Sequence, residues 1–361
     1  MPVGNKMPHT LKRNKKYTIA TWAGAVLIVV SFLVALLAYY IAPDSSPNGN
    51  RMLPELANSR PGFSIQALQL LKTEAPAATS FFNRLLNGVP DACLFIPLRQ
   101  FYVRSDSIII EKYIDEGVWE KQTYALAACA IKPVTTLHFY LGSDRFGRDI
   151  ASRLIIGTRV SLSVGFVAVL LSLTIGISLG ALAGYFKGRT DDVIMWLINV
   201  IWSIPTLLLV FAITLVLGKG FWQVFIAVGL TMWVNVARLV RGQVLYVREM
   251  EYVEAARALG YSDRRIIVKH ILPNIMGPVL VIAANNFASA IVIEAGLSFL
   301  GVGVQPPQPS WGLMIKENYN FIITHNPMLA LAPGITIMLL VLAFNLLGNG
   351  LRDALQVKSK V

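Results

Sequence analysis

Residues that could carry out acid-base, nucleophilic or metal chemistry are few and scattered in this sequence. The four histidines stand at positions 9, 138, 270 and 325, without the close spacing of a metal-ligand set. Clusters of His, Asp or Glu at catalytic spacing do not occur, and neither does a Gly-x-x-x-x-Gly-Lys-Ser/Thr phosphate loop. We therefore expect no enzyme activity, no metal site and no cofactor in this chain.

One charged segment has a spacing that suggests a function. Residues 251–259 are good helix formers, and Gly260 suits the left-handed turn that ends a helix. Ser262 or Asp263 can cap a second short helix, and Pro273 disfavours simple continuation into the apolar residues that follow. The segment therefore predicts two short helices joined by a turn.

The first of these helices has the composition of a docking surface. Its alanines present a small surface that another protein can approach closely, and charged side chains surround it. The expected contacts are Glu254, Ala255, Ala256 and Gly260, with Arg257 and Arg264 at the rim. An ordinary loop at the membrane surface is the alternative that the pattern alone leaves open.

The composition shows what must position these residues. The chain is 55% hydrophobic and only 14% charged, with a mean hydropathy of +0.58, which is too apolar for a water-soluble domain. Apolar stretches approach or exceed the roughly 20 residues that a membrane-spanning helix needs. They lie at 17–42, 160–186, 193–217, 221–240, 275–300 and 328–351. We therefore expect an all-α polytopic membrane protein with six transmembrane helices.

Basic residues set the expected orientation in the membrane. The net charge is +12, but the basic residues lie between apolar runs rather than on the face of a soluble domain, so nucleic-acid binding is not expected. The basic tail 1–16 is placed in the cytoplasm by the positive-inside rule, and alternation then puts the stretch 238–269 and the tail 352–361 there too. The first apolar run is longer than the apolar core of a usual signal peptide and predicts a retained anchor, with a cleavable signal peptide as the alternative.

Residues 43–157 form a small extracytoplasmic insert between the first two spans. Its early part is rich in proline, and later apolar and β-branched residues predict a small folded unit with a strand near 105–114. Cys93 and Cys129, the two cysteines of the chain, both lie in this insert. Because the outer compartment is oxidising, we expect a disulfide between them, with two buried free thiols as the alternative.

The charged segment also carries a resemblance to a known family. Glu254-Ala255-Ala256, Gly260 and Leu272-Pro273 together resemble the EAA loop of ABC-importer permeases, which stands in a cytoplasmic loop before the penultimate span. His270, two places ahead of this Leu-Pro pair, is similar to the dipeptide and oligopeptide branch. Further matches include Leu297-Ser-Phe-Leu-Gly301 and Pro306-Pro-Gln-Pro-Ser-Trp-Gly312. Over about residues 140–358 the chain resembles the C-type permease of the dipeptide, oligopeptide and nickel transporters.

The resemblance implies an ABC-importer permease fold and a set of partners. The permease core would occupy residues 158–351, with a coupling loop at 241–273 that contacts an ATPase. Two ATPase subunits would carry ATP and Mg²⁺, a homologous second permease would complete a heterodimer, and an extracytoplasmic solute-binding protein would deliver the cargo. The expected location is the bacterial inner membrane, where the chain contacts lipid. Peptides are the first expectation for the cargo, while nickel, glutathione-like peptides and sugar-derived solutes stay open.

Polar residues in the fifth span are candidates for the transport pathway. They are Asn285, Asn286, Ser289 and Glu294. Polar groups at membrane depth usually face protein or water, and Asn286 and Glu294 lie near one helical face. Hydrogen bonding between helices is the alternative for the two asparagines, and a position near the outer interface is the alternative for Glu294. A different function also stays open, that of a membrane-anchored accessory or signalling protein acting through the insert.

Overall fold

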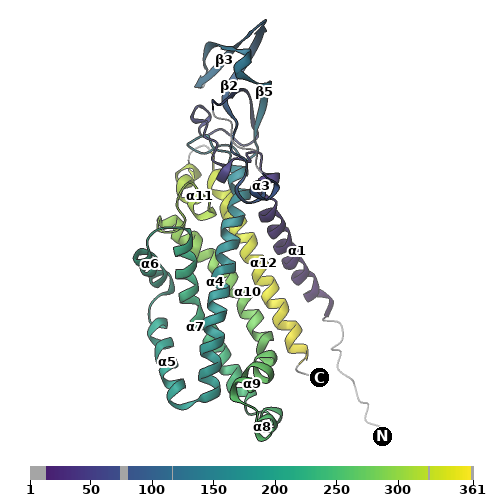
Figure 1. Ribbon diagram of the computed structural model, residues 1–361, viewed down its shortest axis with the longest axis vertical. Coiled ribbons are helices and arrows are strands. Elements are labelled where there is room, and N and C mark those ends of the chain that lie inside the picture. The colour runs from purple at the N-terminus through teal and green to yellow at the C-terminus, as the bar shows by residue number, and fades with distance from the viewer. Residues whose placement is uncertain (1–13, 74–79, 116, 324–325, 359–361) are drawn as a thin grey trace, which may run out of the picture.

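The computed structural model describes residues 14–73, 80–115, 117–323 and 326–358. Within them the chain is mostly helical, with one β-sheet (Figure 1). The longer helices are α1 (Asn14–Leu36), α4 (Ile150–Phe186), α5 (Gly188–Trp202), α6 (Thr206–Leu217), α7 (Phe221–Val247), α10 (Leu272–Leu300) and α12 (Met328–Lys358). The shorter ones are α2 (Ala38–Ile41), α3 (Phe81–Asn87), α8 (Glu251–Ala258), α9 (Asp263–Arg265) and α11 (Trp311–Asn318). Predictions that concern residues 1–13, 359–361, His9 and His325 lie outside the described residues.

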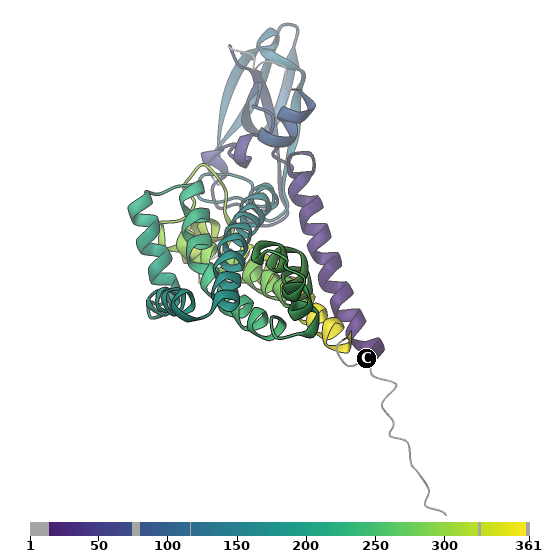
Figure 2. The same cartoon turned by 60° about the horizontal axis from the view of Figure 1, so that its bottom comes forward.

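The apolar helices confirm a polytopic membrane protein. Among the described residues, five helices are long and apolar enough to cross a membrane, or up to six if one bent pair counts as a span. They run side by side, with α1 beside α12 at the edge of the bundle (Figures 1 and 2). The sheet stands beyond one end of the bundle and α8 lies at the other.

The third predicted span is not one straight helix. The stretch 193–217 is divided between α5 and α6, which meet at a bend of 90°. The break falls at residues 203–205, and Pro205 lies immediately before the first residue of α6. Proline has no N–H to continue the hydrogen-bond ladder of a preceding helix, and its ring clashes with the turn before it, so α5 ends here.

The second span is longer than predicted. Helix α4 begins at Ile150, ten residues before the start of the predicted span 160–186, because Asp149 caps it. The Asp149 carboxylate accepts a hydrogen bond from the Ser152 N–H at 2.8 Å, which satisfies one of the free N–H groups of the first turn. Its 37 residues extend about 55 Å, well beyond the hydrocarbon thickness of a bilayer. Helix α4 is therefore longer than a single crossing requires, and its first turn adjoins the insert.

Helix α4 also forms the centre of the bundle through its contact with α7. Glycines along α4 allow the two backbones to approach closely. A Cβ on Gly180 would lie 2.5 Å from the Ala237 carbonyl oxygen, and one on Gly176 would lie 2.5 Å from the Val236 Cβ. Small residues at helix contacts are the usual means of close packing within membranes. Residues larger than glycine at these positions would push α4 and α7 apart.

The insert between the first two spans folds as a five-stranded antiparallel sheet. Its strands are β1 (Phe63–Leu71), β2 (Cys93–Arg104), β3 (Ser107–Asp115), β4 (Val118–Ala125) and β5 (Cys129–Phe139), in the order β4-β3-β2-β1-β5. Leu68, Leu98, Ile108 and Ile110 are fully buried in its small core. The alternation of apolar and polar residues explains how one face is covered while the other meets water. The all-α class thus applies to the membrane part, and the insert is a β unit.

The expected disulfide is absent, because both cysteines are free thiols. Cys93 on β2 pairs with Leu71 of β1, whereas Cys129 on β5 pairs with Leu70 on the opposite edge of the same strand. The two cysteines are therefore about two strand spacings apart, roughly 10 Å, and a disulfide needs Cα atoms within about 7 Å. The prediction was wrong because β1 lies between the cysteines, which sequence spacing does not reveal.

A buried charge cluster joins the base of the insert to the membrane helices. The Arg148 guanidinium donates to the Asp144 carboxylate at 2.6 Å and to the Glu317 carboxylate of α11 at 2.8 Å. Arg153, which is fully buried, donates to the same Glu317 oxygen at 3.5 Å. The Nε and Nη1 atoms of Arg153 have no partner among the described residues. Glu317 therefore compensates the charge of two buried arginines.

Candidate coupling loop and membrane cavity

Helix α8 is an exposed knob at the end of the bundle opposite the sheet (Figure 1). The predicted contact residues Glu254, Ala255, Arg257 and Gly260 are exposed there, as is Arg264 in the next short helix. Gly260 has φ +77°, the left-handed conformation that the sequence predicted for the residue after the helix. The exposed set offers both a small apolar surface and charges of both signs.

Ala256 is the exception among the predicted contacts. It is only 4% exposed, and it packs with Val253 into a core that includes Val244 of α7 and Ile271 and Ile275 beyond the loop. An alanine suits either an open surface or a tight core, so the sequence alone did not separate the two. Ala256 supports the knob from below, whereas Ala255 lies on its surface.

Leu259 is a surface residue of the knob that the sequence interpretation did not identify. Its side chain is 73% exposed immediately after α8, although leucine prefers burial. Ala255 follows Tyr252 by three residues and precedes Leu259 by four, so the three side chains share one face of the helix. The exposed surface is therefore apolar at its centre. A large exposed apolar residue surrounded by charges is a signal for a protein contact.

Besides its apolar packing on α7 and α10, the loop has a polar contact with α4. The Tyr185 hydroxyl of α4 donates to the Asp263 carboxylate at 2.6 Å, and the Arg257 guanidinium lies 5.8 Å from the Tyr185 ring centre. Ser262 lies immediately before α9, but its side chain does not cap this helix. Nearby, the hydrogen bond and charge of Lys187 lower the pKa of Glu249. Three spans therefore contact the loop.

Pro273 does not interrupt the helix as the sequence suggested. Residues Ile266–Ile271 form a widened π-type helix that runs directly into α10, and the continuous helical stretch is Asp263–Leu300. Pro273 occupies the first turn of α10, where a missing N–H is tolerated. The second half of the loop, from Asp263, is consequently a direct extension of α10.

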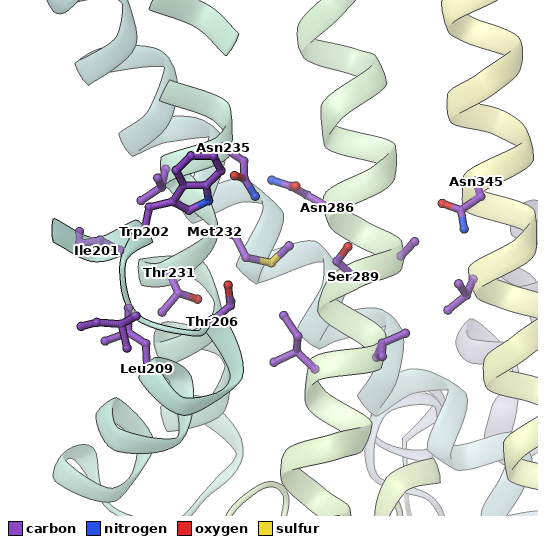
Figure 3. A pocket seen from close by; sticks show the side chains of 16 residues that line it. Ile201, Trp202, Thr206, Leu209, Thr231, Met232, Asn235, Asn286, Ser289 and Asn345 are labelled. Carbon is purple, nitrogen blue, oxygen red and sulfur yellow. The ribbon is translucent and has the colours of Figure 1, made fainter. Parts of the chain in front are cut away.

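A cavity of about 430 Å³ lies among α5, α6, α7, α10 and α12 (Figure 3). Its polar lining is neutral and comes from Thr206, Thr231, Asn235, Asn286, Ser289 and Asn345. The amides of Asn235 and Asn286 point toward one another across it, and the Asn286 Nδ2 has no partner among the described residues although Asn286 is 4% exposed. An unpaired buried donor is costly unless something else accepts its hydrogen bond. Asn286 thus contributes an unpaired amide group to the wall of the cavity.

The structure separates the four predicted pathway residues. Asn286 and Ser289 line the cavity. Asn285, on another side of α10, lies close to Gly348 of α12, where a Cβ would be 2.8 Å from its Oδ1. Glu294 is fully buried outside the cavity lining and accepts a hydrogen bond from Ser298 at 2.7 Å. A pathway role for Asn286 and Ser289 agrees with their position, while Asn285 and Glu294 lie in contacts between elements.

A metal site is not visible in the part of the chain that the structure describes. There, no three His, Cys, Asp or Glu side chains form a group that could hold an ion. The buried Glu294 carboxylate accepts hydrogen bonds from hydroxyl groups instead, one from Ser298 and one from Ser161 of α4 at 3.5 Å. The hydrogen bond between Ser161 and Glu294 joins α4 to the last part of α10.

Apolar helices that surround a cavity with a polar lining, with an exposed loop helix at one end, define a membrane transport protein. Comparison with protein families makes this specific. Residues 176–360 match the family described as "binding-protein-dependent transport system inner membrane component". The chain belongs to this family, and it is an integral membrane permease subunit of an ABC transporter rather than an enzyme. The sheet lies outside the matched residues.

Individual relatives show the branch of the family. A glutathione transport system permease protein of Pectobacterium atrosepticum is 43% identical over 221 residues, which cover 61% of this chain and 73% of the relative. An oligopeptide transport system permease protein of Bacillus subtilis is 41% identical over 229 residues, 63% of this chain and 74% of the relative. Among solved structures, the inward-facing MetNI methionine ABC transporter covers 54% of this chain at 19% identity and a TM-score of 0.47.

Proposed function

We propose that the chain is one of two different permease subunits of an importer that carries peptides across the bacterial inner membrane, with both of its termini in the cytoplasm. The observation that carries the proposal is the exposed knob around α8, rigidly packed on α7 and α10. Relatives at 41–43% identity are named for oligopeptide and glutathione transport, which supports a peptide cargo. Neither the structure nor the comparisons favour the alternative of an accessory or signalling protein.

In this proposal the knob transmits the work of ATP hydrolysis. Two partner ATPase subunits bind ATP and Mg²⁺, and one of them receives the surface of Tyr252, Ala255 and Leu259. Because Val253 and Ala256 fix α8 to the core, a displacement of the knob moves α7 and α10 with it. ATP and the cargo then act at different sites on one equilibrium between two global states, which is allosteric coupling.

The cavity is the proposed pathway of this subunit. Its neutral lining provides hydrogen-bond donors and acceptors without a fixed charge. Such a lining suits the amide groups that all peptides share, and it does not select among their side chains. The homologous second permease completes the pathway, and an extracytoplasmic binding protein supplies the cargo.

Substitution of Gly260 tests the coupling. Gly260→Val forces a branched residue into φ +77°, so the knob changes shape. Gly62→Val is the matched control, because Gly62 in the insert has φ +79° and, like Gly260, open space around it. We expect both variants to be present in the membrane in similar amounts. Only Gly260→Val should lose peptide uptake and the co-purification of the ATPase subunits. Normal uptake by that variant would refute the coupling role.

Cysteine substitution tests the pathway. Ser289 lines the cavity, whereas Ser178 is equally an exposed serine within a span but lies outside the cavity. After modification with a small methanethiosulfonate, Ser289→Cys should lose peptide uptake and Ser178→Cys should keep it. Equal inhibition of the two, or of neither, would show that the cavity is not the pathway.

Purification from the native membrane in mild detergent tests the assembly. A second permease and ATPase subunits should be recovered with the tagged chain, and the assembly should hydrolyse ATP. A Leu259→Asp variant should lose the ATPase subunits while retaining the second permease, since only the knob is altered. Recovery of the chain alone from the unaltered cells would contradict the importer proposal.

A further inference from the structure

Helix α3 is a short amphipathic helix in the insert that belongs neither to the sheet nor to the transport cavity. Its side chains Phe81, Phe82 and Leu86 are 65%, 72% and 59% exposed. Single apolar residues on a surface are ordinary, but three on a helix of seven residues form a patch. Asn83, Arg84 and Asn87 provide its polar side.

The orientation of α3 is fixed by contacts with the membrane helices. Arg159 of α4 donates through Nη1 to the carbonyl oxygens of Leu85 and Leu86, at 3.1 and 2.9 Å. Gly88 ends the helix with φ +78°, and a Cβ there would lie 2.8 Å from the Tyr39 ring. The helix is therefore held against α2 and α4, and its apolar residues are presented outward on a rigid base.

The same contacts place α3 at the height of the outer membrane surface. The apolar part of α1, Ile19–Leu36, has 18 residues and spans about 27 Å, close to the thickness of a hydrocarbon core. Tyr39 and Tyr40 follow one turn later, where tyrosine is enriched at membrane interfaces. The Tyr40 ring centre is 5.8 Å from that of Phe81, and the Arg84 guanidinium lies 4.5 Å over Tyr40.

The exposed side of α3 is continuous with a surface that meets lipid. Helix α1 lies at the edge of the bundle (Figure 2), and Leu36 at its end and Ile41 of α2 are about half exposed. Figure 1 shows α3 beside the outer end of this helix. An apolar patch that adjoins a lipid-facing span at interfacial height, with a basic residue beside it, has the composition of a helix lying in the membrane surface.

We propose that α3 is a membrane-surface anchor of the insert. Phe81, Phe82 and Leu86 enter the boundary between headgroups and acyl chains of the outer leaflet, and Arg84 meets lipid phosphate. The insert is thereby attached to the outer face at two places, through the buried charge cluster of Arg148, Arg153 and Glu317 and through the lipid. This attachment fixes the height of the sheet above the membrane.

Fluorine relaxation tests the proposal on the full chain. Phe82→4-trifluoromethylphenylalanine is a conservative change at an exposed position, and Tyr102→4-trifluoromethylphenylalanine is the matched control, because Tyr102 is 58% exposed on β2 of the sheet. Each variant is placed in bilayer discs of phosphatidylethanolamine and phosphatidylglycerol. Dissolved oxygen concentrates in the acyl region, and a gadolinium chelate stays in water.

We expect the ratio of oxygen-induced to gadolinium-induced relaxation to be several-fold larger at position 82 than at position 102. Equal ratios would show that α3 lies in water and would overturn the anchor. Protection of position 82 from both agents, appearing only when the partner subunits are present, would show that a protein covers the patch and would also overturn it.

Discussion

Removal of the Glu317 carboxylate should destabilise the outer part of the protein strongly. Arg148 and Arg153 have side-chain exposures of 2% and 0%, and Glu317 is the acid that both contact. In Glu317→Gln the two guanidinium groups remain buried with less compensation. Breaking a buried ion pair from one side costs about 3–5 kcal/mol. At about 2 °C per kcal/mol for a chain of this size, the unfolding midpoint should fall by roughly 6–10 °C.

Intrinsic fluorescence of the detergent-purified chain on heating provides the assay, because the chain has seven tryptophans. Glu249→Gln is the matched control, since the Glu249 side chain is 60% exposed in its pair with Lys187, and an exposed pair contributes little. Adding Arg153→Met to Glu317→Gln should recover part of the loss, because one uncompensated charge is removed. A Glu317→Gln midpoint no lower than that of Glu249→Gln would refute this account of the cluster.

Other predictions follow from burial and close packing. Without any reducing agent, a maleimide should modify both Cys93 and Cys129, and Cys129 should react more slowly because burial raises the pKa of its thiol; a protected pair that reacts only after reduction would contradict the free thiols. Gly180→Ala should lower thermal stability by about 1–3 kcal/mol through overpacking against α7. Gly242→Ala on α7, where the space is open, should be neutral or slightly stabilising, and equal losses would show that the α4–α7 contact relaxes freely.

The membrane part could be predicted because its physical requirements are visible in the sequence. A helix that crosses lipid needs about 20 apolar residues, so the positions of α1, α7, α10 and α12 followed from hydropathy. The break between α5 and α6 could not be predicted in the same way. An apolar run with one proline is compatible with either a kinked span or two helices, and packing around the cavity decides between them.

The candidate site residues also differ in whether local sequence or tertiary packing determines their positions. Gly260 was predictable because a left-handed turn after a helix favours glycine whatever the surroundings. The burial of Ala256, the exposure of Leu259 and the separation of Asn285 from Asn286 depend on which helices meet which faces. The failed pairing of Cys93 and Cys129 has the same cause, since strand order is a property of the folded sheet.

Helix α4 has a mechanical consequence for the whole molecule. It is one uninterrupted rod whose first end adjoins Asp149 and the insert, while its other end reaches Tyr185 beside the knob. A rod of about 55 Å that tilts by about 5° about its middle displaces each end by roughly 2 Å in opposite directions. Any rocking of the end beside the knob therefore tilts the sheet at the opposite end of the rod by the same angle.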